Sequence, residues 1–196
     1  MPRLFIALSV PDAAERALRE ICYCVPGARF TPSGHFHLTL RFMGELDAKA
    51  FSDLRDALYD IRNEPFNLFV QGVGSFPLRG TPRTLWVGAS VSGVAPRSFA
   101  SDPLIRLQRN VEKRVVALGH KPDDRKFHPH VTIARLSEGR GMSERVAQFL
   151  AANSLWRAEP FTVNVFHLYS SRMKSDGPHY QIEQTYPLYE PISVPS

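Results

Sequence analysis

One short stretch, residues 34–42, constrains the fold of this chain more than any other segment. From Phe36 to Phe42 apolar and polar residues alternate, which is typical of a β-strand with one buried face. Because successive side chains of a strand point to opposite faces, the stretch predicts one polar and one apolar face. The polar face is expected to carry His37, Thr39 and Arg41, and the apolar face Leu38, Leu40 and Phe42.

The same pattern returns in the second half of the chain, at residues 128–135. There His130 and Thr132 share a face, as His37 and Thr39 do in the first stretch. Arg135 falls on the opposite face by alternation, and it contacts a ligand of that site only if a β-bulge or the strand end re-aims it. The two motif histidines are separated by almost half the chain, which indicates two related halves.

Other segments predict alternating strands and helices. Further strands are expected at 2–10, 66–76, 84–91, 161–172 and 179–188, and helices at 11–24, 47–62, 102–118 and 143–152. The expected helix N-caps are Asp47, Ser101 or Asp102, and Ser143. The pattern predicts one α+β domain, 1–196, of two interleaved lobes (approximate halves 1–95 and 96–196). Two antiparallel sheets with outer helices would be related by a pseudo-twofold around a central cleft.

Composition narrows the possible partners and compartments. The formal net charge is +5, and 19 of the 24 basic residues are arginine, a side chain suited to phosphate and equally a mark of GC-rich coding sequence. No signal peptide and no run of about 20 apolar residues is visible, so a cytoplasmic protein without a membrane span is expected. Cys22 and Cys24 are expected as reduced thiols. No heptad pattern occurs, and a monomer is expected.

Two histidines on facing strands can share one acid–base reaction. A neutral imidazole accepts a proton from a nucleophile, and a protonated one donates a proton to a leaving oxygen, since the ordinary histidine pKa is about 6.5. In phosphoester cleavage the attacking and leaving oxygens lie roughly in line, so one histidine on each side of phosphorus fits. Threonine hydroxyls can bind the non-bridging oxygens. The sequence does not decide which histidine is the acid.

The paired segments 37–40 and 130–133 resemble the HxTx signatures of the two-histidine (2H) phosphoesterases. The surroundings are similar to the bacterial RNA 2′,3′-cyclic phosphodiesterases, a family also called 2′-5′ RNA ligase. The similar segments occur in order along nearly the whole chain, at 3–8, 37–46, 76–77, 82–83, 85–88, 129–136 and 177–180.

The resemblance implies a bilobal α+β fold and hydrolysis of a terminal 2′,3′-cyclic phosphate to a 2′-phosphomonoester, without metal or cofactor. It further implies reversible 2′-5′ ligation. His37 would be the proton donor and His130 the proton acceptor, while Thr39 and Thr132 would hold the phosphate. Expected substrates are RNA ends bearing a cyclic phosphate, such as tRNA fragments, or small cyclic nucleotides.

Two alternatives stay open at this level. His35 and His128, which are unusual at these family positions, form His-x-His pairs with the motif histidines and could bind a divalent ion in a metallohydrolase. The chain could instead be an RNA-end binding module without turnover. Aromatic residues that could stack a base, although core positions are the simpler expectation, are Phe76, Trp86, Phe127, Phe166 and Tyr180.

Overall fold

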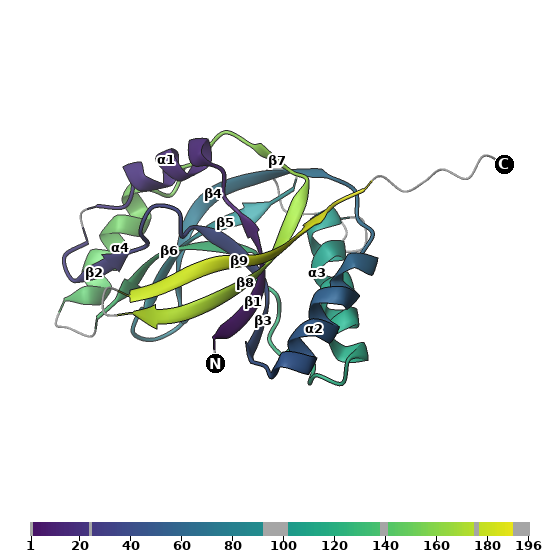
Figure 1. The fold of residues 1–196 in the computed structure, drawn as a ribbon. Coiled ribbons are helices and arrows are strands. Elements are labelled where there is room, and N and C mark those ends of the chain that lie inside the picture. The colour runs from purple at the N-terminus through teal and green to yellow at the C-terminus, as the bar shows by residue number, and fades with distance from the viewer. Residues whose placement is uncertain (1, 24, 92–101, 138–140, 175–176, 190–196) are drawn as a thin grey trace.

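The computed structural model describes residues 2–23, 25–91, 102–137, 141–174 and 177–189, and within them a nine-stranded antiparallel sheet forms the centre of the fold (Figure 1). The strands are β1 (Arg3–Ser9), β2 (Ala28–Phe30), β3 (His37–Glu45), β4 (Phe66–Phe76), β5 (Thr84–Ser90), β6 (His130–Leu136), β7 (Phe161–Val163), β8 (Val165–Lys174) and β9 (Gly177–Pro187). Their order in the sheet is β7–β4–β5–β6–β3–β1–β8–β9, and β2 pairs with β6 beside this path.

Four helices of the described residues lie outside the sheet: α1 (Asp12–Glu20), α2 (Ala48–Ala57), α3 (Pro103–Ala117) and α4 (Met142–Ala152). A 3-10 turn, η1 (Leu58–Asp60), extends α2. Figure 1 shows α2 and α3 together at one end of the sheet and α1 and α4 towards the other. The expected caps Asp47 and Asp102 are confirmed, because each side chain accepts a hydrogen bond from a backbone N–H of the first turn.

The sheet consists of two four-stranded halves that meet at β3 and β6. One half is β7–β4–β5–β6 and the other is β3–β1–β8–β9, and Leu38 of β3 pairs with Val131 of β6 at their junction. Each half of the sheet takes two strands from the first half of the sequence and two from the second. The predicted α+β class, with antiparallel pairing and outer helices, is confirmed, and the two sheets run into each other through this junction.

The main hydrophobic core lies on the face of the sheet that the helices cover. Leu38 and Val131 point into it, and the helices contribute their apolar stripes, including Leu54 of α2 and Leu107 of α3. A smaller cluster of Phe5, Ala7 and Tyr169, with Tyr180 packed against it, lies on the opposite face. This second face also carries the motif histidines, and the small apolar cluster packs beside His37.

Two local predictions are wrong, and one short strand was missed. Ser143 lies inside α4, whose N-cap is Gly141, at φ 76°. The strand expected at 161–172 is divided at Asn164, because β7 pairs with β4 in one half of the sheet and β8 pairs with β1 in the other. The short strand β2, which pairs with β6, was not predicted.

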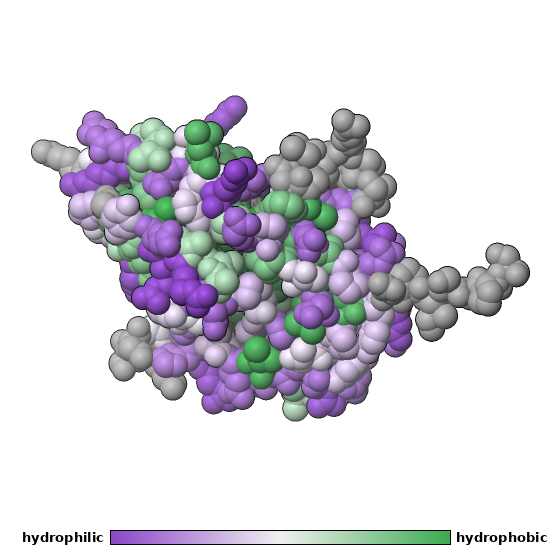
Figure 2. All heavy atoms as spheres, turned by 90° about the horizontal axis from the view of Figure 1, so that it is seen from above, coloured by the Kyte–Doolittle hydropathy of each residue, from purple (hydrophilic) through white to green (hydrophobic). Residues whose placement is uncertain are grey.

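Several expectations fall outside the described residues: the loop at 92–100, Ser101, Cys24 and the turn residues 175–176. Cys22 follows α1, and burial raises the pKa of its thiol to about 11. Within the described residues, no helix has the length and apolar character that a membrane crossing requires. On the face shown in Figure 2, hydrophobic side chains are interspersed with hydrophilic ones.

Candidate active site

A β-bulge interrupts the alternation of β3 directly after its motif threonine. Thr39 pairs with Ala7 of β1, whereas Arg41 pairs with Ile6, so Leu40 is left without a partner on β1. Ile6 faces the main core, and the bulge therefore turns Arg41 away from the polar face of the motif. The prediction that Arg41 shares a face with the first motif histidine is wrong, because alternation was read through a position where the register shifts.

The bulge moves Phe42 in the opposite direction. Phe42 was expected on the core face, but it pairs with Phe5 of the cleft-side cluster and is 55% exposed. Its ring centroid lies 6.1 Å from that of Phe5. A large aromatic side chain therefore lines the open face of the sheet at a position where alternation predicted buried packing.

An equivalent bulge lies in β6. Trp86 of β5 pairs with Thr132, and Leu85 pairs with Ala134, so the residue between Thr132 and Ala134 has no partner on β5. Ala134 is fully buried, and Arg135 returns to the face of Thr132. The sequence analysis required a bulge to bring Arg135 to the face of the second motif, and the structure contains this bulge.

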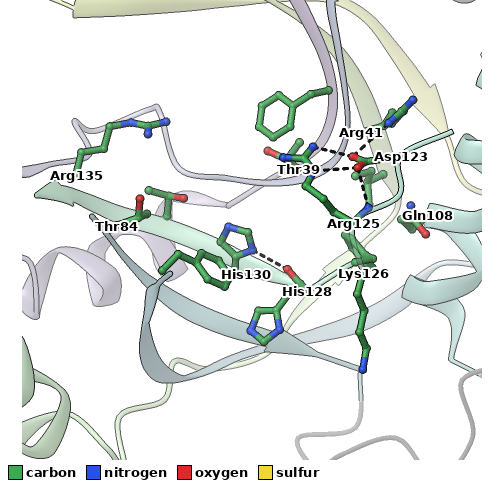
Figure 3. A pocket seen from close by; sticks show the side chains of 15 residues that line it. Thr39, Arg41, Thr84, Gln108, Asp123, Arg125, Lys126, His128, His130 and Arg135 are labelled. Carbon is green, nitrogen blue, oxygen red and sulfur yellow. Dashed lines mark hydrogen bonds and ion pairs between the residues drawn. The ribbon is translucent and has the colours of Figure 1, made fainter. Parts of the chain in front are cut away.

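A cleft of about 470 Å³ lies between β3, β4, β5, β6, α3 and the segment 123–128 that leads into β6. In Figure 3, Arg135 and Thr84 lie on one side of His130, and Gln108 and Arg125 lie on the other. The polar and charged side chains that line it are Thr39, Arg41, Thr84, Gln108, Asp123, Arg125, Lys126, His128, His130, Thr132 and Arg135.

Both motif histidines are held by the same backbone hydrogen bond. Nδ1 of His37 lies 2.8 Å from the carbonyl oxygen of His35, and Nδ1 of His130 lies 2.6 Å from that of His128. A carbonyl oxygen can only accept, so Nδ1 carries the proton and donates in both rings. In the neutral imidazole Nε2 is then the basic nitrogen, which leaves it free to exchange a proton with a ligand.

The protonation of His37 is disfavoured by its surroundings. Burial lowers the pKa of His37 to about 4, although the hydrogen bond to the His35 carbonyl opposes the shift. Positive charge on His130 or Arg135, both on β6, lowers this pKa further. The imidazole is therefore neutral at neutral pH as long as no anion lies beside it.

His130 is shifted in the same direction for the same main reason. Burial lowers its pKa, the hydrogen bond to the His128 carbonyl opposes this, and repulsion from the His128 ring adds to it. Burial and the charge of Lys126 also lower the pKa of His128. A site of neutral imidazoles beside the Arg135 guanidinium is prepared to receive an anion.

Aromatic rings enclose each motif histidine. The centroid of His37 lies 4.9 Å from Phe5 and 5.1 Å from Tyr180, and that of His130 lies 5.0 Å from Phe76. The Trp86 ring lies against the Cα of Gly74, where a Cβ would be only 2.2 Å from the ring. These rings supply the burial that lowers both pKa values.

Of the other predicted stacking residues, Phe127 lines the cleft and Phe166 is fully buried in the main core. Gln108, Arg125 and Lys126 also line the cleft but were not predicted, since they lie on a helix and a loop without the motif pattern. The sequence shows only a charged run before the second motif, and this run does not indicate which of its side chains reach the cleft.

The additional histidines do not form a metal site with their neighbours. Among the residues that the structure describes, no three His, Cys, Asp or Glu side chains gather so as to hold a metal ion. The His35 ring lies 5.0 Å from Tyr180, and the His128 ring lies 4.8 Å from Trp86. The contribution of His35 and His128 to the site is through their backbone carbonyl oxygens, which orient the rings of His37 and His130.

Comparison with known proteins agrees with this geometry. The sequence model described as "2'-5' RNA ligase superfamily" matches residues 9–174. An RNA 2′,3′-cyclic phosphodiesterase of Aeropyrum pernix is 37% identical over 55% of this chain and 57% of that protein, so the match spans little more than half of this relative. Another of the same name from Archaeoglobus fulgidus is 27% identical over 91% of this chain and 96% of that protein.

Solved structures share the fold. A protein of Thermus thermophilus superposes with a TM-score of 0.75 at 26% identity, covering 95% of this chain and 97% of that one. E. coli LigT in complex with 3′-AMP superposes with a TM-score of 0.74 at 24% identity, covering 97% and 100%. The second likeness is one of architecture alone.

Proposed function

Because the chain belongs to the 2′-5′ RNA ligase superfamily, we propose that it hydrolyses terminal 2′,3′-cyclic phosphodiesters of RNA to 2′-phosphomonoesters. His37 and His130 would divide the proton transfers. One observation carries the proposal: two imidazoles from distant parts of the chain lie on one face at the β3–β6 junction, each with Nδ1 bound to a carbonyl. Relatives named RNA 2′,3′-cyclic phosphodiesterase support the substrate class.

The reaction needs one base and one acid on opposite sides of phosphorus. Nε2 of His130 takes a proton from water as its oxygen bonds to phosphorus, and the bond from phosphorus to the 3′ oxygen breaks. Nε2 of His37 gives its proton to that oxygen, which leaves as a hydroxyl, and the phosphate remains on the 2′ oxygen. The assignment of His37 as the acid follows the family pattern.

In this proposal the hydroxyls of Thr39 and Thr132 donate to the non-bridging oxygens, which is supported by the alternation that puts each on the face of its motif histidine before the bulge begins. Arg135 lines the same cleft and supplies a positive charge. Both contacts strengthen as negative charge accumulates on the phosphate oxygens in the transition state.

The anionic substrate would itself prepare the acid. The charge of a cyclic phosphate opposes the burial and the cationic repulsion that lower the pKa of His37, so binding raises this pKa and favours the protonated ring.

The same mechanism accommodates ligation. If the 5′-hydroxyl of a second RNA replaces water, the identical proton transfers yield a 2′-5′ linkage, and microscopic reversibility returns the cyclic end.

Product analysis tests the proposal. A nucleoside 2′,3′-cyclic phosphate and an RNA ending in one are incubated with the protein in EDTA, and 2′- and 3′-phosphates are separated by chromatography. Formation of the 2′-phosphate alone is the expected result. Activity that disappears in EDTA and returns with zinc would instead indicate a metallohydrolase, and tight binding of the RNA end without turnover at micromolar protein would indicate a binding module.

A further inference from the structure

Arg41 is tied into a network of charges beside the cleft. Its guanidinium lies 3.2 Å from a carboxylate oxygen of Glu112 on α3 and 3.2 Å from one of Asp123, and it donates to the carbonyl oxygen of Lys121 at 2.5 Å. The Arg41 side chain is only 10% exposed. Arg41 thus joins β3 to a helix and to the segment that precedes β6.

Asp123 is the centre of this network. Its backbone N–H donates to Glu112, and its carboxylate accepts two hydrogen bonds from the Arg125 side chain as well as one from the Arg125 backbone. These contacts, with the charge of Arg41, hold the pKa of the Asp123 carboxyl far below its usual range. Figure 3 shows Asp123 between Arg41 and Arg125.

The network holds residues 121–125, and His128 follows three residues later in the same segment. The carbonyl oxygen of His128 accepts the hydrogen bond that fixes the ring of His130. A displacement of the segment would therefore move the carbonyl and release the ring.

The segment before the first motif is also held by a charged side chain, in this case a carboxylate. Glu15 of α1 is 7% exposed and accepts hydrogen bonds from the Ser33 hydroxyl and the Gly34 N–H, both at the end of the segment that leads to His35. The carbonyl of His35 fixes the ring of His37. Before each motif, charged side chains hold the segment that supplies the orienting carbonyl: Glu15 before the first, and the network of Arg41 before the second.

We infer that Arg41 and Glu15 are positioning residues, each of which sets the orientation of one motif histidine through the backbone segment before it. Arg41 acts on His130, which is on the other strand of the junction, and Glu15 acts on His37. Ala134, the bulge-equivalent of Arg41 in β6, is fully buried and has no charge, so the two halves use unrelated positions for one task. The expected effects on turnover rest on the proposed function, whereas the expected effects on ring orientation do not.

Nitrogen-15 NMR of the imidazole rings tests the inference without any substrate, since the Nδ1 and Nε2 shifts report the tautomer. Arg41→Ala is expected to introduce the second tautomer in His130 and leave His37 unchanged, and Glu15→Ala is expected to do the reverse. Arg114→Ala, which breaks an ion pair with Asp60 away from the cleft, is the matched control. Unchanged His130 shifts in Arg41→Ala would overturn the inference.

Kinetics separate positioning from direct contact. Glu112 does not line the cleft, so Glu112→Gln should reproduce the effect of Arg41→Ala if Arg41 acts through the network. We expect kcat to fall about 10- to 100-fold in both, with smaller changes in KM, because small displacements of a catalytic group have effects of this size. Arg41→Lys should recover part of the rate.

A different result would identify Arg41 as a substrate contact. In that case KM would rise in Arg41→Ala while Glu112→Gln kept wild-type kinetics, and the inference would be wrong. Thermal unfolding of each variant shows that it is folded, and Asp123→Asn, which keeps the shape of the side chain, replaces any variant that is not. Absence of turnover in the wild type would refute the proposed function but leave the NMR result decisive for the positioning role.

Discussion

Leu38 of β3 lies opposite Val131 of β6 in an antiparallel pairing, and this pair relates the two motifs by a local two-fold. One residue to either side, the register places His37 beside Thr132 and Thr39 beside His130. The two histidines are thus diagonal neighbours on one face, a relationship that spans roughly 7–8 Å between strands. This is room for one phosphate group between two imidazoles.

Replacement of either motif histidine by alanine is expected to lower kcat by about 10²- to 10⁴-fold, because each removes one of two proton transfers. Hydrolysis of a 2′,3′-cyclic nucleotide, followed by chromatography, measures the effect. His120→Ala, at a position that follows α3 and belongs to neither motif strand, is the control and should keep the wild-type rate. Full activity in His37→Ala or His130→Ala would refute the assignment.

Arg135→Ala is expected to lower kcat/KM about 10- to 100-fold, because a charge-assisted hydrogen bond to phosphate is worth on the order of 1.5–3 kcal/mol. Arg135 reaches the cleft face through the β6 bulge. Steady-state kinetics of Arg135→Ala are compared with those of Arg55→Ala, which replaces a partly exposed arginine of α2 outside the cleft lining. Equal kinetics in both variants would contradict the placement of Arg135 at the phosphate.

The pH dependence of kcat/KM is expected to be bell-shaped with its maximum below about pH 6.5, the ordinary histidine pKa. Burial lowers the pKa of both motif histidines in the free protein, and kcat/KM reports the free protein. The kcat profile should lie at higher pH, because the bound anion raises the pKa of the acid. A kcat/KM maximum above about pH 7 would disagree with the burial of these rings.

Acid should destabilise the fold through His37. The unfolded ring has a pKa of about 6.5 and the folded ring one of about 4, so the unfolded state binds more protons between these values. Stability is therefore complete above about pH 6.5 and is lost as the pH falls towards about 4, by on the order of 2–3 kcal/mol for this residue. Urea unfolding at about pH 7 and about pH 4.5 measures this loss of stability in the wild type and in His37→Asn. If both proteins lost the same free energy of unfolding between the two pH values, His37 would not be its source.

Gly74→Ala is expected to destabilise the protein by about 1–3 kcal/mol, because the new methyl group would overlap the Trp86 ring. Thermal or urea unfolding measures the loss, and tryptophan fluorescence reports the displaced ring. In a Trp86→Leu background the same substitution should cost much less, which gives the coupling between the two positions. An undiminished cost in that background would place the strain elsewhere.

The sequence by itself determined the elements and the identity of the chemical groups. Alternation gave strands β4 and β5 nearly to the residue, and Asp47 and Asp102 marked two helix starts, because caps and periodicity are local properties of the chain. The two His-x-Thr segments stood out for the same reason, since each is a short pattern on one strand.

Only the tertiary structure decided which arginine lies on the same face as the motif histidines. Alternation placed Arg41 with His37 and Arg135 away from His130, and bulges at Leu40 and Ile133 reversed both. A bulge is a register shift against a partner strand, here β1 or β5, and nothing within β3 or β6 records it. The same holds for the loop charges and for the carbonyls that orient the histidines, because their positions follow from contacts between segments far apart in the chain.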